Sequence, residues 1–428
     1  MQTGRRLLGN GRHRTPGRGL MPVRPTSVGP PMARVERGHR GERRPDSGQA
    51  GARRQFDNRP LLVFWETTKA CDLACAHCRA DAQRDPGPDE LSTAEGFALI
   101  DDLAGIGRPR PILILTGGDC LKRDDIVTIA THAKSMGVPA AIAPSVTPQL
   151  TSPRLWALCD QGVKTASLSL DGATAGTHDA VRGIDGHFEA TLAAIRRLQR
   201  HGLTVQINTT VMRSNIGELA DIAALMHEMN VDIWEVFFLI TTGRGTHIEA
   251  STAEENEEIC NFLVDASQYG FTVRTVEAPF FRRVALERRR AGGMPAETTF
   301  EHGPLYSQLH DRLQTLLGPP TAPVRAPSAA TRDGKGIIFV AANGDVYPSG
   351  FLPLRLGNVR DQSLMQIYRD DPLLRAIRDA DFAGQCGVCE HADLCGGSRS
   401  RAYAASGDPL GEDPGCILTL AGAALPHP

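Results

Sequence analysis

Short apolar segments alternate with amphipathic stretches between residues 61 and 239, and this alternation restricts the chain to few folds. Segments with strand character lie at 61–65, 111–115, 139–143, 165–170, 203–211 and 233–239. Helical patterns between them include 92–103, 154–161, 188–201 and 216–229. Strands alternating with helices predict repeated βα units on a parallel sheet. Six units are fewer than the eight of a closed barrel, so we expect an α/β fold with an open, partial (β/α)6 barrel.

The sequence beyond 239 predicts a connection followed by a small domain. Three consecutive arginines from Arg288, a Gly-Gly pair and four prolines favour a linker over 287–333, interrupted by a short helix near 305–317. We expect this linker to act as a lid. An apolar run followed by Asn343-Gly344 predicts a β-hairpin. The expected parts are an extension at 1–57, a barrel at 58–286, the linker at 287–333 and a C-terminal domain at 334–428.

Charge is distributed unevenly, although the formal net charge of the chain is only −2. Residues 1–55 hold 13 Arg, no Lys and 3 acidic residues, a net of +10, which leaves −12 for the remainder. The segment has no Phe, Tyr, Trp or Ile, so we expect it to be disordered. An organelle transit peptide, a nucleic-acid-binding arm and an inert leader before a later start at Met21 or Met32 are the alternatives. We favour the inert leader and expect no nucleic-acid partner.

Ten cysteines limit the possible class of protein. A disulfide scaffold is short and cysteine-dense, whereas this chain has 428 residues and places seven of its cysteines in two tight groups. This pattern predicts metal or iron–sulfur chemistry in a reducing compartment, and we expect a cytoplasmic protein. No run of 18 apolar residues is present, so we expect no membrane span. The isolated Cys120, Cys159 and Cys260 are interpreted as core residues, with a redox role for Cys120 as the alternative.

The first cysteine group follows the first expected strand and consists of Cys71, Cys75 and Cys78. Structural zinc prefers four closed ligands, whereas three thiolates without a local fourth leave a coordination position open. Thiolates also ligate iron–sulfur cubes, and three of them leave one iron free for a substrate or cofactor. A structural metal knuckle is the alternative.

This CxxxCxxC group, with the segments that follow it, resembles the radical S-adenosylmethionine superfamily. Gly117-Gly118-Asp119, after the second strand, is similar to the GGE segment that holds the methionine amino group, with Asp in place of Glu. Ser169 and Asp171 lie in a segment similar to SLDG, and Arg182 lies in a match to HDxxRG that runs from His178 to Gly183. The resemblance implies that Ser169 and Arg182 contact the ribose and the methionine carboxylate, and that the His77 ring lies against the adenine. Asp171 alone is also compatible with a helix N-cap.

The second cysteine group consists of Cys386, Cys389, Cys395 and Cys416. Its local sequence resembles the SPASM extension of radical S-adenosylmethionine enzymes, especially the subgroup that modifies haem precursors and other tetrapyrroles. A full SPASM domain has seven cysteines and two clusters, but here Ser349 and Ser398 stand where members of the family have cysteine. The resemblance therefore implies one fully ligated auxiliary [4Fe–4S] cluster beside the radical cluster, with a four-thiolate zinc ion as the alternative.

The resemblance implies an oxidoreductase that cleaves S-adenosylmethionine to a 5′-deoxyadenosyl radical and oxidises a substrate, and we assign no catalytic residue. A flavodoxin or ferredoxin would supply electrons. Tetrapyrrole side-chain modification and peptide maturation are the two substrate alternatives, and an iron–sulfur or zinc sensor is the non-enzyme alternative. Arg244 is either a substrate-carboxylate contact or a solvated loop residue.

Overall fold

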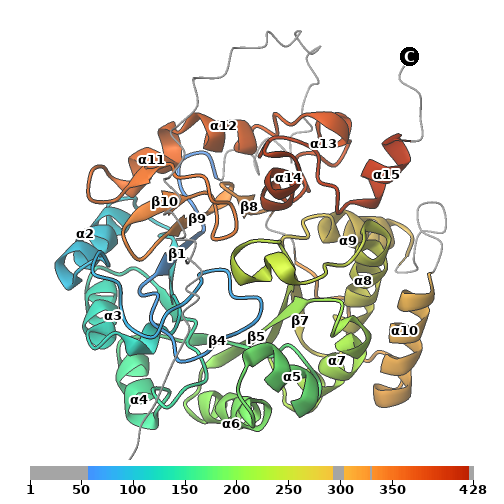
Figure 1. Ribbon diagram of the computed structural model, residues 1–428, viewed down its shortest axis with the longest axis horizontal. Coiled ribbons are helices and arrows are strands. Elements are labelled where there is room, and N and C mark those ends of the chain that lie inside the picture. The colour runs from blue at the N-terminus through green and yellow to red at the C-terminus, as the bar shows by residue number, and fades with distance from the viewer. Residues whose placement is uncertain (1–55, 293–302, 328–329, 424–428) are drawn as a thin grey trace, which may run out of the picture. The chain divides into compact units, whose positions relative to one another are not determined.

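The computed structural model of the chain describes residues 56–292, 303–327 and 330–423 (Figure 1). The predicted disordered extension lies outside the described residues, apart from Phe56 and Asp57. Phe56 is buried against Gly336, and its carbonyl oxygen accepts a hydrogen bond of 2.7 Å from the Tyr368 hydroxyl. Phe56 therefore belongs to the folded part of the chain, and the predicted boundary at 57 is too late.

Parallel strands with intervening helices form the first part of the fold, and Figure 1 shows the helices outside the strands. The strands are β1 (Leu62–Glu66), β2 (Ile112–Thr116), β3 (Ala140–Ile142), β4 (Thr165–Ser169), β5 (Thr204–Val211), β6 (Ile233–Phe238) and β7 (Thr272–Val276). The helices are α2 (Thr93–Ala104), α3 (Ile126–Ser135), α4 (Ser152–Asp160), α5 (Ala175–Arg182), α6 (His187–Arg200), α7 (Leu219–Glu228), α8 (Ala253–Ala266) and α9 (Phe281–Arg290). Each strand pairs in parallel with the next, which confirms the predicted α/β partial barrel.

Side-chain alternation along β5 explains how the sheet is covered. Successive residues point to opposite faces of a strand, and every second residue of β5, from Val205 to Val211, is buried. The intervening residues, including Gln206 and Asn208, are half-buried. One face of the strand therefore packs in the core, while the other carries polar groups.

After β6, the described chain continues the predicted series of six parallel strands with a further strand, β7. Strand β7 pairs with β6, but its sequence, Thr-Val-Arg-Thr-Val, places only Val273 in the buried class. A short strand with one buried residue gives little hydrophobic signal. The pattern was therefore too weak to indicate this strand.

The described part of the expected linker contains a packed helix, α10 (Pro304–Leu317). It packs against α7 and α8 through Tyr306, Leu309 and Leu313, which are buried. This segment is therefore part of the helical layer (Figure 1). The position of α10 does not support a lid, which stays a prediction.

The C-terminal segment extends the same sheet. Strand β9 pairs in parallel with β1, and β10 then pairs antiparallel with β9, so the sheet continues through the predicted domain boundary. The remaining elements are β8 (Arg332–Asp333), β9 (Gly336–Val340), β10 (Asp345–Tyr347), β11 (Gly357–Asn358), α11 (Leu364–Asp370), α12 (Pro372–Arg378), α13 (Gly384–Val388), α14 (Arg399–Ser406) and α15 (Ile417–Ala423). The predicted hairpin is confirmed as β9 and β10.

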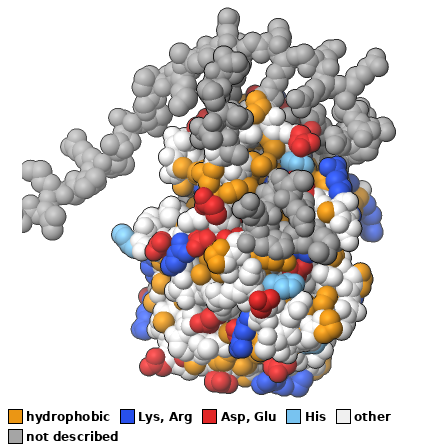
Figure 2. Space-filling view, turned by 90° about the vertical axis from the view of Figure 1, so that its right-hand side faces the viewer, with side chains coloured by type: hydrophobic (Ala, Val, Ile, Leu, Met, Phe, Trp, Pro, Cys, Tyr) orange, Lys and Arg blue, Asp and Glu red, His pale blue; other side chains and the backbone are white. Residues whose placement is uncertain are grey.

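Surface charge is mixed on the face drawn in Figure 2, where acidic and basic side chains are interspersed. Within the described ranges, no helix is long and apolar enough to cross a membrane. Cys120 and Cys260 are fully buried, which confirms their interpretation as core residues, and Cys159 is half-buried against the core.

Candidate active site

The loop after β1 brings the first cysteine group together. Cys71 and Cys75 are buried and pack in one cluster with the half-buried Cys78. The Cys71 sulfur accepts a hydrogen bond of 3.4 Å from the Leu73 amide and lies 3.6 Å from the Ser145 hydroxyl. Amides directed at sulfur favour the thiolate form that ligates iron, while burial raises the pKa of the free Cys71 thiol.

Two glycines at the carboxyl end of β2 allow this cysteine loop to approach the sheet. Gly117 has φ +149°, and a Cβ atom there would lie 2.4 Å from the Thr68 carbonyl oxygen. A Cβ atom on Gly118 would lie 2.5 Å from the Ala70 carbonyl oxygen. The Gly118 amide instead donates to Thr68 at 2.8 Å. Both glycines are therefore needed for backbone contact with the residue that precedes Cys71.

Asp119 is buried, and both oxygens of its carboxylate already accept hydrogen bonds. Thr147 donates to Oδ2 at 2.7 Å, and the Leu121 amide donates to Oδ1 at 3.1 Å. Burial raises the pKa of this carboxyl group. These bonds give Asp119 a role in holding the loops together, while its contact with a methionine amino group stays a prediction.

Asp171 joins two other predicted cofactor-binding residues, His77 and Arg182. Its Oδ2 atom accepts from Arg182 at 2.5 Å and lies 2.9 Å from His77 Nε2. Its Oδ1 atom accepts from the Thr210 amide at 2.7 Å. The opposite charge of Arg182, followed by His77, keeps the pKa of Asp171 well below its usual value despite complete burial. Ser169 ends β4, two residues before Asp171.

Arg182 also connects this carboxylate to the first cysteine group. It is buried, and its Nη1 atom donates to the Cys75 sulfur at 3.4 Å. The structure thus brings His77, Asp171, Arg182 and Cys75 into one hydrogen-bonded set, although they come from three separate segments. A guanidinium group can donate hydrogen bonds to a thiolate and to a carboxylate at the same time.

Two buried histidines lie behind Asp171. The Asp171 amide donates to His178 Nδ1 at 3.1 Å, and His178 Nε2 lies 2.9 Å from His187 Nδ1. Because His187 Nε2 lies 3.1 Å from the Val146 carbonyl, which only accepts, the hydrogens must run from His178 to His187. Both rings are therefore neutral, and burial lowers the pKa of His178 to about 3. This series of hydrogen bonds ends at a cavity of about 530 Å³, which is lined by residues that include Leu73, Val146 and His187.

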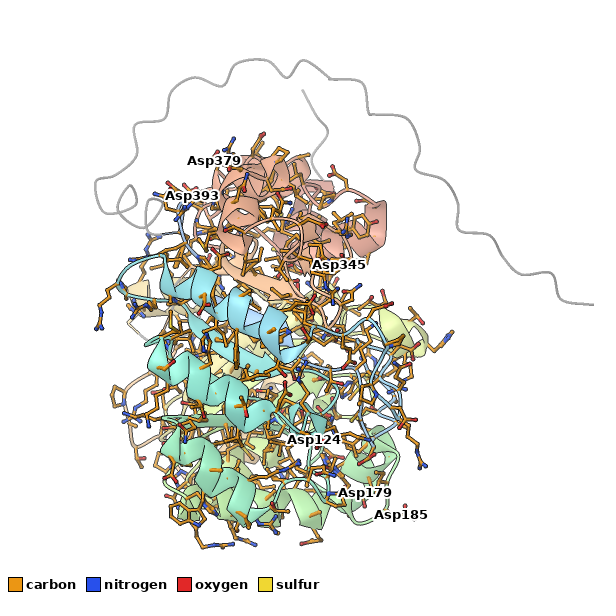
Figure 3. The ribbon with its side chains drawn as sticks, turned by 90° about the vertical axis from the view of Figure 1, so that its left-hand side faces the viewer. Asp124, Asp179, Asp185, Asp345, Asp379 and Asp393 are labelled. Atoms are coloured by element: carbon orange, nitrogen blue, oxygen red, sulfur yellow. The ribbon has the colours of Figure 1, made fainter. Side chains whose placement is uncertain are left out.

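Asp179, in the same HDxxRG match, has a structural position. Its carboxylate accepts from the amides of Gly186 and Phe188, each at 2.7 Å, and so fixes the turn into α6. Figure 3 shows Asp179 beside Asp185 in this turn, while Asp379 and Asp393 lie in the C-terminal part of the molecule.

The loop after β6 packs on the cysteine loop. Arg244 Nε donates to the Cys75 carbonyl at 3.0 Å, and its amide donates to the Cys78 carbonyl at 3.1 Å. Gly243 has φ +55°, and a Cβ atom there would lie 2.6 Å from the Cys78 carbonyl. Arg244 is therefore a support of the cysteine loop, which the sequence did not indicate.

Polar residues on the inner strand faces are further candidates that sequence reasoning missed. Gln206 donates to Asn208 and to Glu235, each at 2.8 Å. Burial raises the pKa of Glu235, with Arg274 acting in the opposite direction. The only sequence signal was polar residues at alternate positions of β5 and β6, which also suits an ordinary half-exposed strand.

The second cysteine group surrounds one small cavity in the C-terminal part. Cys386, Cys389, Cys395 and Cys416 all line it. Backbone amides donate to three of the sulfurs, from Asp413 to Cys386 at 3.4 Å, from His391 to Cys389 at 3.4 Å and from Gly397 to Cys395 at 3.5 Å.

Four thiolates and these amide donors are the surroundings that an iron–sulfur cube requires. In the described part of the chain, no three Cys, His, Asp or Glu side chains converge on a single point suited to one metal ion. The four cysteines line one small cavity, so they are placed to ligate a single group.

Both serines that replace family cysteines lie in a neighbouring buried network. Ser398 donates to Glu277, and Ser349 lies 3.4 Å from the Ser400 hydroxyl. The Ser400 hydroxyl lies 2.7 Å from Asp333 and 3.1 Å from Glu277. The two carboxyl groups compete for one hydroxyl hydrogen, so we expect one of them to carry a proton. Burial and their mutual repulsion raise the pKa of Glu277.

Comparisons with known proteins agree with this geometry. The Radical SAM superfamily model matches residues 65–226, and the SPASM iron–sulfur cluster-binding domain model matches 332–391. The AdoMet-dependent heme synthase of Oleidesulfovibrio alaskensis is 34% identical over 89% of this chain and 94% of that protein. Pre-heme d1 synthase of Dinoroseobacter shibae is 29% identical over 84% of this chain and 87% of that protein. Streptococcus suis SuiB, solved with S-adenosylmethionine, shares the fold with TM-score 0.60 at 14% identity, covering 86% and 80% of the two chains.

The fold and the two cysteine groups define an iron–sulfur enzyme that uses S-adenosylmethionine. The chain belongs to the radical S-adenosylmethionine superfamily and carries a SPASM domain. Within this superfamily it falls in the subgroup that includes the AdoMet-dependent heme synthases. Its cofactors are accordingly S-adenosylmethionine, a radical-generating [4Fe–4S] cluster and an auxiliary iron–sulfur cluster.

Proposed function

We propose that the enzyme oxidises a tetrapyrrole side chain. The observation that carries this proposal is 34% identity to AdoMet-dependent heme synthases over nearly the whole length of both proteins. The similarity covers the barrel and the C-terminal segment together, so it extends beyond the cofactor motifs that all radical S-adenosylmethionine enzymes share. Fold likeness alone would not indicate a substrate.

The residues of the first site divide into ligands and supports. We propose that Cys71, Cys75 and Cys78 hold the radical cluster, which, with bound S-adenosylmethionine, supplies a 5′-deoxyadenosyl radical. His77, Ser169 and Arg182 would orient the cofactor. His77 and Arg182 contact the Asp171 carboxylate, and Ser169 ends β4 two residues before Asp171. Gly117, Gly118 and Asp119 would keep the cysteine loop against β2.

We propose that the cluster held by the second cysteine group would receive an electron from the substrate. Abstraction of one hydrogen atom leaves a substrate radical, which must lose one electron to complete a dehydrogenation or an oxidative decarboxylation. Cys386, Cys389, Cys395 and Cys416 occupy all ligand positions of a cube, which suits electron transfer better than substrate ligation. A reduced flavodoxin or ferredoxin would supply the electron that starts each turnover.

Metal content and cofactor cleavage test the cofactor assignment. We expect the anaerobically reconstituted protein to hold about eight iron and eight sulfide per chain, four of each per cube. After reduction it should convert S-adenosylmethionine to methionine and 5′-deoxyadenosine. About four iron with one zinc would contradict the auxiliary cluster, and no cleavage by a fully loaded protein would favour the sensor alternative.

Substrate assays under the same conditions test the tetrapyrrole assignment. With iron-coproporphyrin III we expect faster 5′-deoxyadenosine formation and a product that lacks the elements of formic acid from a propionate side chain. Cleavage unaffected by the porphyrin, but coupled to modification of a short precursor peptide, would favour the peptide-maturase alternative.

A further inference from the structure

Two buried arginines with unusual partners contact cysteines that line the auxiliary-cluster cavity. Arg399 is fully buried, and its hydrogen bonds go to backbone carbonyls, among them Gly411 at 2.6 Å, and to the Cys386 sulfur at 3.6 Å. Arg332 is also buried and donates only to backbone carbonyls, including that of Cys395 at 3.3 Å, while its Nε atom has no partner in the described structure. Among the described residues, neither guanidinium group has a hydrogen bond to a carboxylate.

Both guanidinium groups lie close to the ring of Phe382. The Arg399 and Arg332 carbons lie 4.3 and 5.1 Å from the centre of its ring. The ring fixes both side chains beside the cavity and excludes water from them. The two positive charges are therefore held in position with little screening.

A third arginine at the cavity provides a contrast. Arg283 lines the same cavity, but it is paired with the carboxylates of Glu257 and Glu287. Its charge is therefore compensated within the protein. Arg332 and Arg399 lack such compensation, although an uncompensated buried charge is costly.

The acidic groups nearest to these arginines compensate their charge only in part. Asp413 is paired with Arg401 at 3.2 Å. Glu277 and Asp333, which we expect to share one proton, lie next to Arg401 and the half-buried Arg282. Asp333 also attracts Arg399, and Asp393 attracts Arg332. The negative group that Arg399 contacts directly is the Cys386 thiolate, and the cluster ligated by the four thiolates would lie beside it.

We propose that Arg332 and Arg399 raise the reduction potential of the auxiliary cluster, which makes it the acceptor of the electron that the substrate radical loses. A thiolate-ligated cluster gains one negative charge on reduction, and two fixed cations beside it stabilise that form. In this step the substrate radical loses one electron and the cluster gains it. An oxidised flavodoxin or ferredoxin then takes the electron away.

This inference rests on the proposed ligands of the auxiliary cluster and not on the identity of the substrate. Its test is a potentiometric titration of the full-length holoenzyme followed by electron paramagnetic resonance. In the wild type we expect the auxiliary cluster to be reduced at a higher potential than the radical cluster. Reduction of the auxiliary cluster only below the radical cluster would overturn the proposal, whatever the variants show.

Charge-removing variants assign the effect to the two arginines. For Arg332→Gln and Arg399→Gln we expect the auxiliary midpoint potential to fall by at least 59 mV, a tenfold change in the reduced-to-oxidised ratio of a one-electron couple. Arg399→Lys keeps the charge and should stay closer to the wild type than Arg399→Gln. Arg375→Gln removes an exposed arginine of the same region and should change nothing.

The outcomes separate this proposal from the proposed function. Unchanged potentials in both Gln variants with full iron content would overturn the role of the arginines. If a Gln variant fails to bind iron, two other measurements test the proposal. These are the midpoint potential of Arg399→Lys and the order of the two cluster potentials in the wild type. A zinc-containing C-terminal site would show the ligand assignment to be wrong, and a non-tetrapyrrole substrate would leave this inference intact.

Discussion

At the scale of single residues, Asp171 connects what the sequence shows only as separate motifs. Its carboxylate meets His77 from the cysteine loop and Arg182 from the end of α5, and its amide donates to His178. A fully buried carboxylate is tolerated because the guanidinium and the donors compensate its charge. Asp171 is thus a positioning residue, which the alternative of a simple helix N-cap did not anticipate.

Asp171→Asn tests this position. The amide keeps the volume but removes the negative charge, which leaves Arg182 buried and unpaired, so we expect a loss of about 3–5 kcal/mol in the free energy of unfolding. S-adenosylmethionine cleavage should also be lost. Chemical denaturation and 5′-deoxyadenosine assays measure the two effects.

Asp221→Asn is the matched control, because Asp221 pairs with the half-exposed Arg312 on the surface. Little change is expected there, since exposed ion pairs contribute little. Equal losses in the two variants would contradict the role of Asp171.

Glu277→Gln tests the shared proton. The folded pKa of Glu277 lies well above its usual value of 4.5, so the folded state binds a proton that the unfolded state has released. The wild type should therefore lose stability as the pH rises from 4.5 through the folded pKa. The amide imitates the protonated acid, so the variant should lose less stability over this range.

Denaturation curves across pH check this difference. Infrared spectra at neutral pH should also show a protonated-carboxyl band in the wild type that the Glu277→Gln variant lacks. A steeper loss of stability in the variant would contradict the shared proton. Arg401 and Asp333, the charged neighbours of Glu277, are the same in both proteins.

At the scale of elements, the contact between the cysteine loop and β2 decides where the first cluster forms. Gly118→Ala would place a Cβ atom 2.5 Å from the Ala70 carbonyl oxygen, so the loop must move away. We expect the reconstituted variant to lose the radical cluster and keep about four iron per chain in the auxiliary site. Iron and sulfide analysis measures this loss.

Gly105→Ala provides the control for that experiment. Gly105 ends α2 with φ −66°, and its Cβ atom would meet nothing closer than 3.4 Å. This variant should hold the full iron content. A Gly118→Ala protein with about eight iron would show that the close approach is not required.

Elements with strong hydrophobic periodicity were predicted well, whereas elements that depend mainly on tertiary contacts were not. The helix at 92–103 is confirmed as α2, which begins with a capping box formed by Ser92 and Glu95. Strand β7 was missed because its stability depends on pairing with β6 rather than on its own hydrophobicity. Helix α10 was expected within a linker, but its three buried side chains place it in the outer layer.

At the scale of the whole molecule, the pairing of β9 with β1 joins the C-terminal segment to the barrel. Removal of residues 330–428 would expose the hydrogen-bonding edge of β1 and uncover apolar core residues of the barrel. We expect the truncated protein to aggregate, as size-exclusion chromatography would show. A monodisperse truncated barrel that still binds iron would contradict this expectation.

Deletion of residues 1–55 is the complementary experiment. These residues lie outside the described ranges, and the sequence analysis favours an inert leader. The shortened protein should keep the iron content and the cofactor cleavage of the full chain. A loss of either would favour a functional arm.

The sequence by itself determined the superfamily, the α/β partial barrel and the two cysteine groups, because hydrophobic periodicity and ligand spacing are local properties of the chain. Only the tertiary structure decided which distant residues meet. It joined His77 to Asp171, placed Arg332 and Arg399 beside the second cysteine group, and set β9 against β1. These contacts bring together residues from separate segments, and their energies depend on burial and pairing in the folded chain, which no local pattern records.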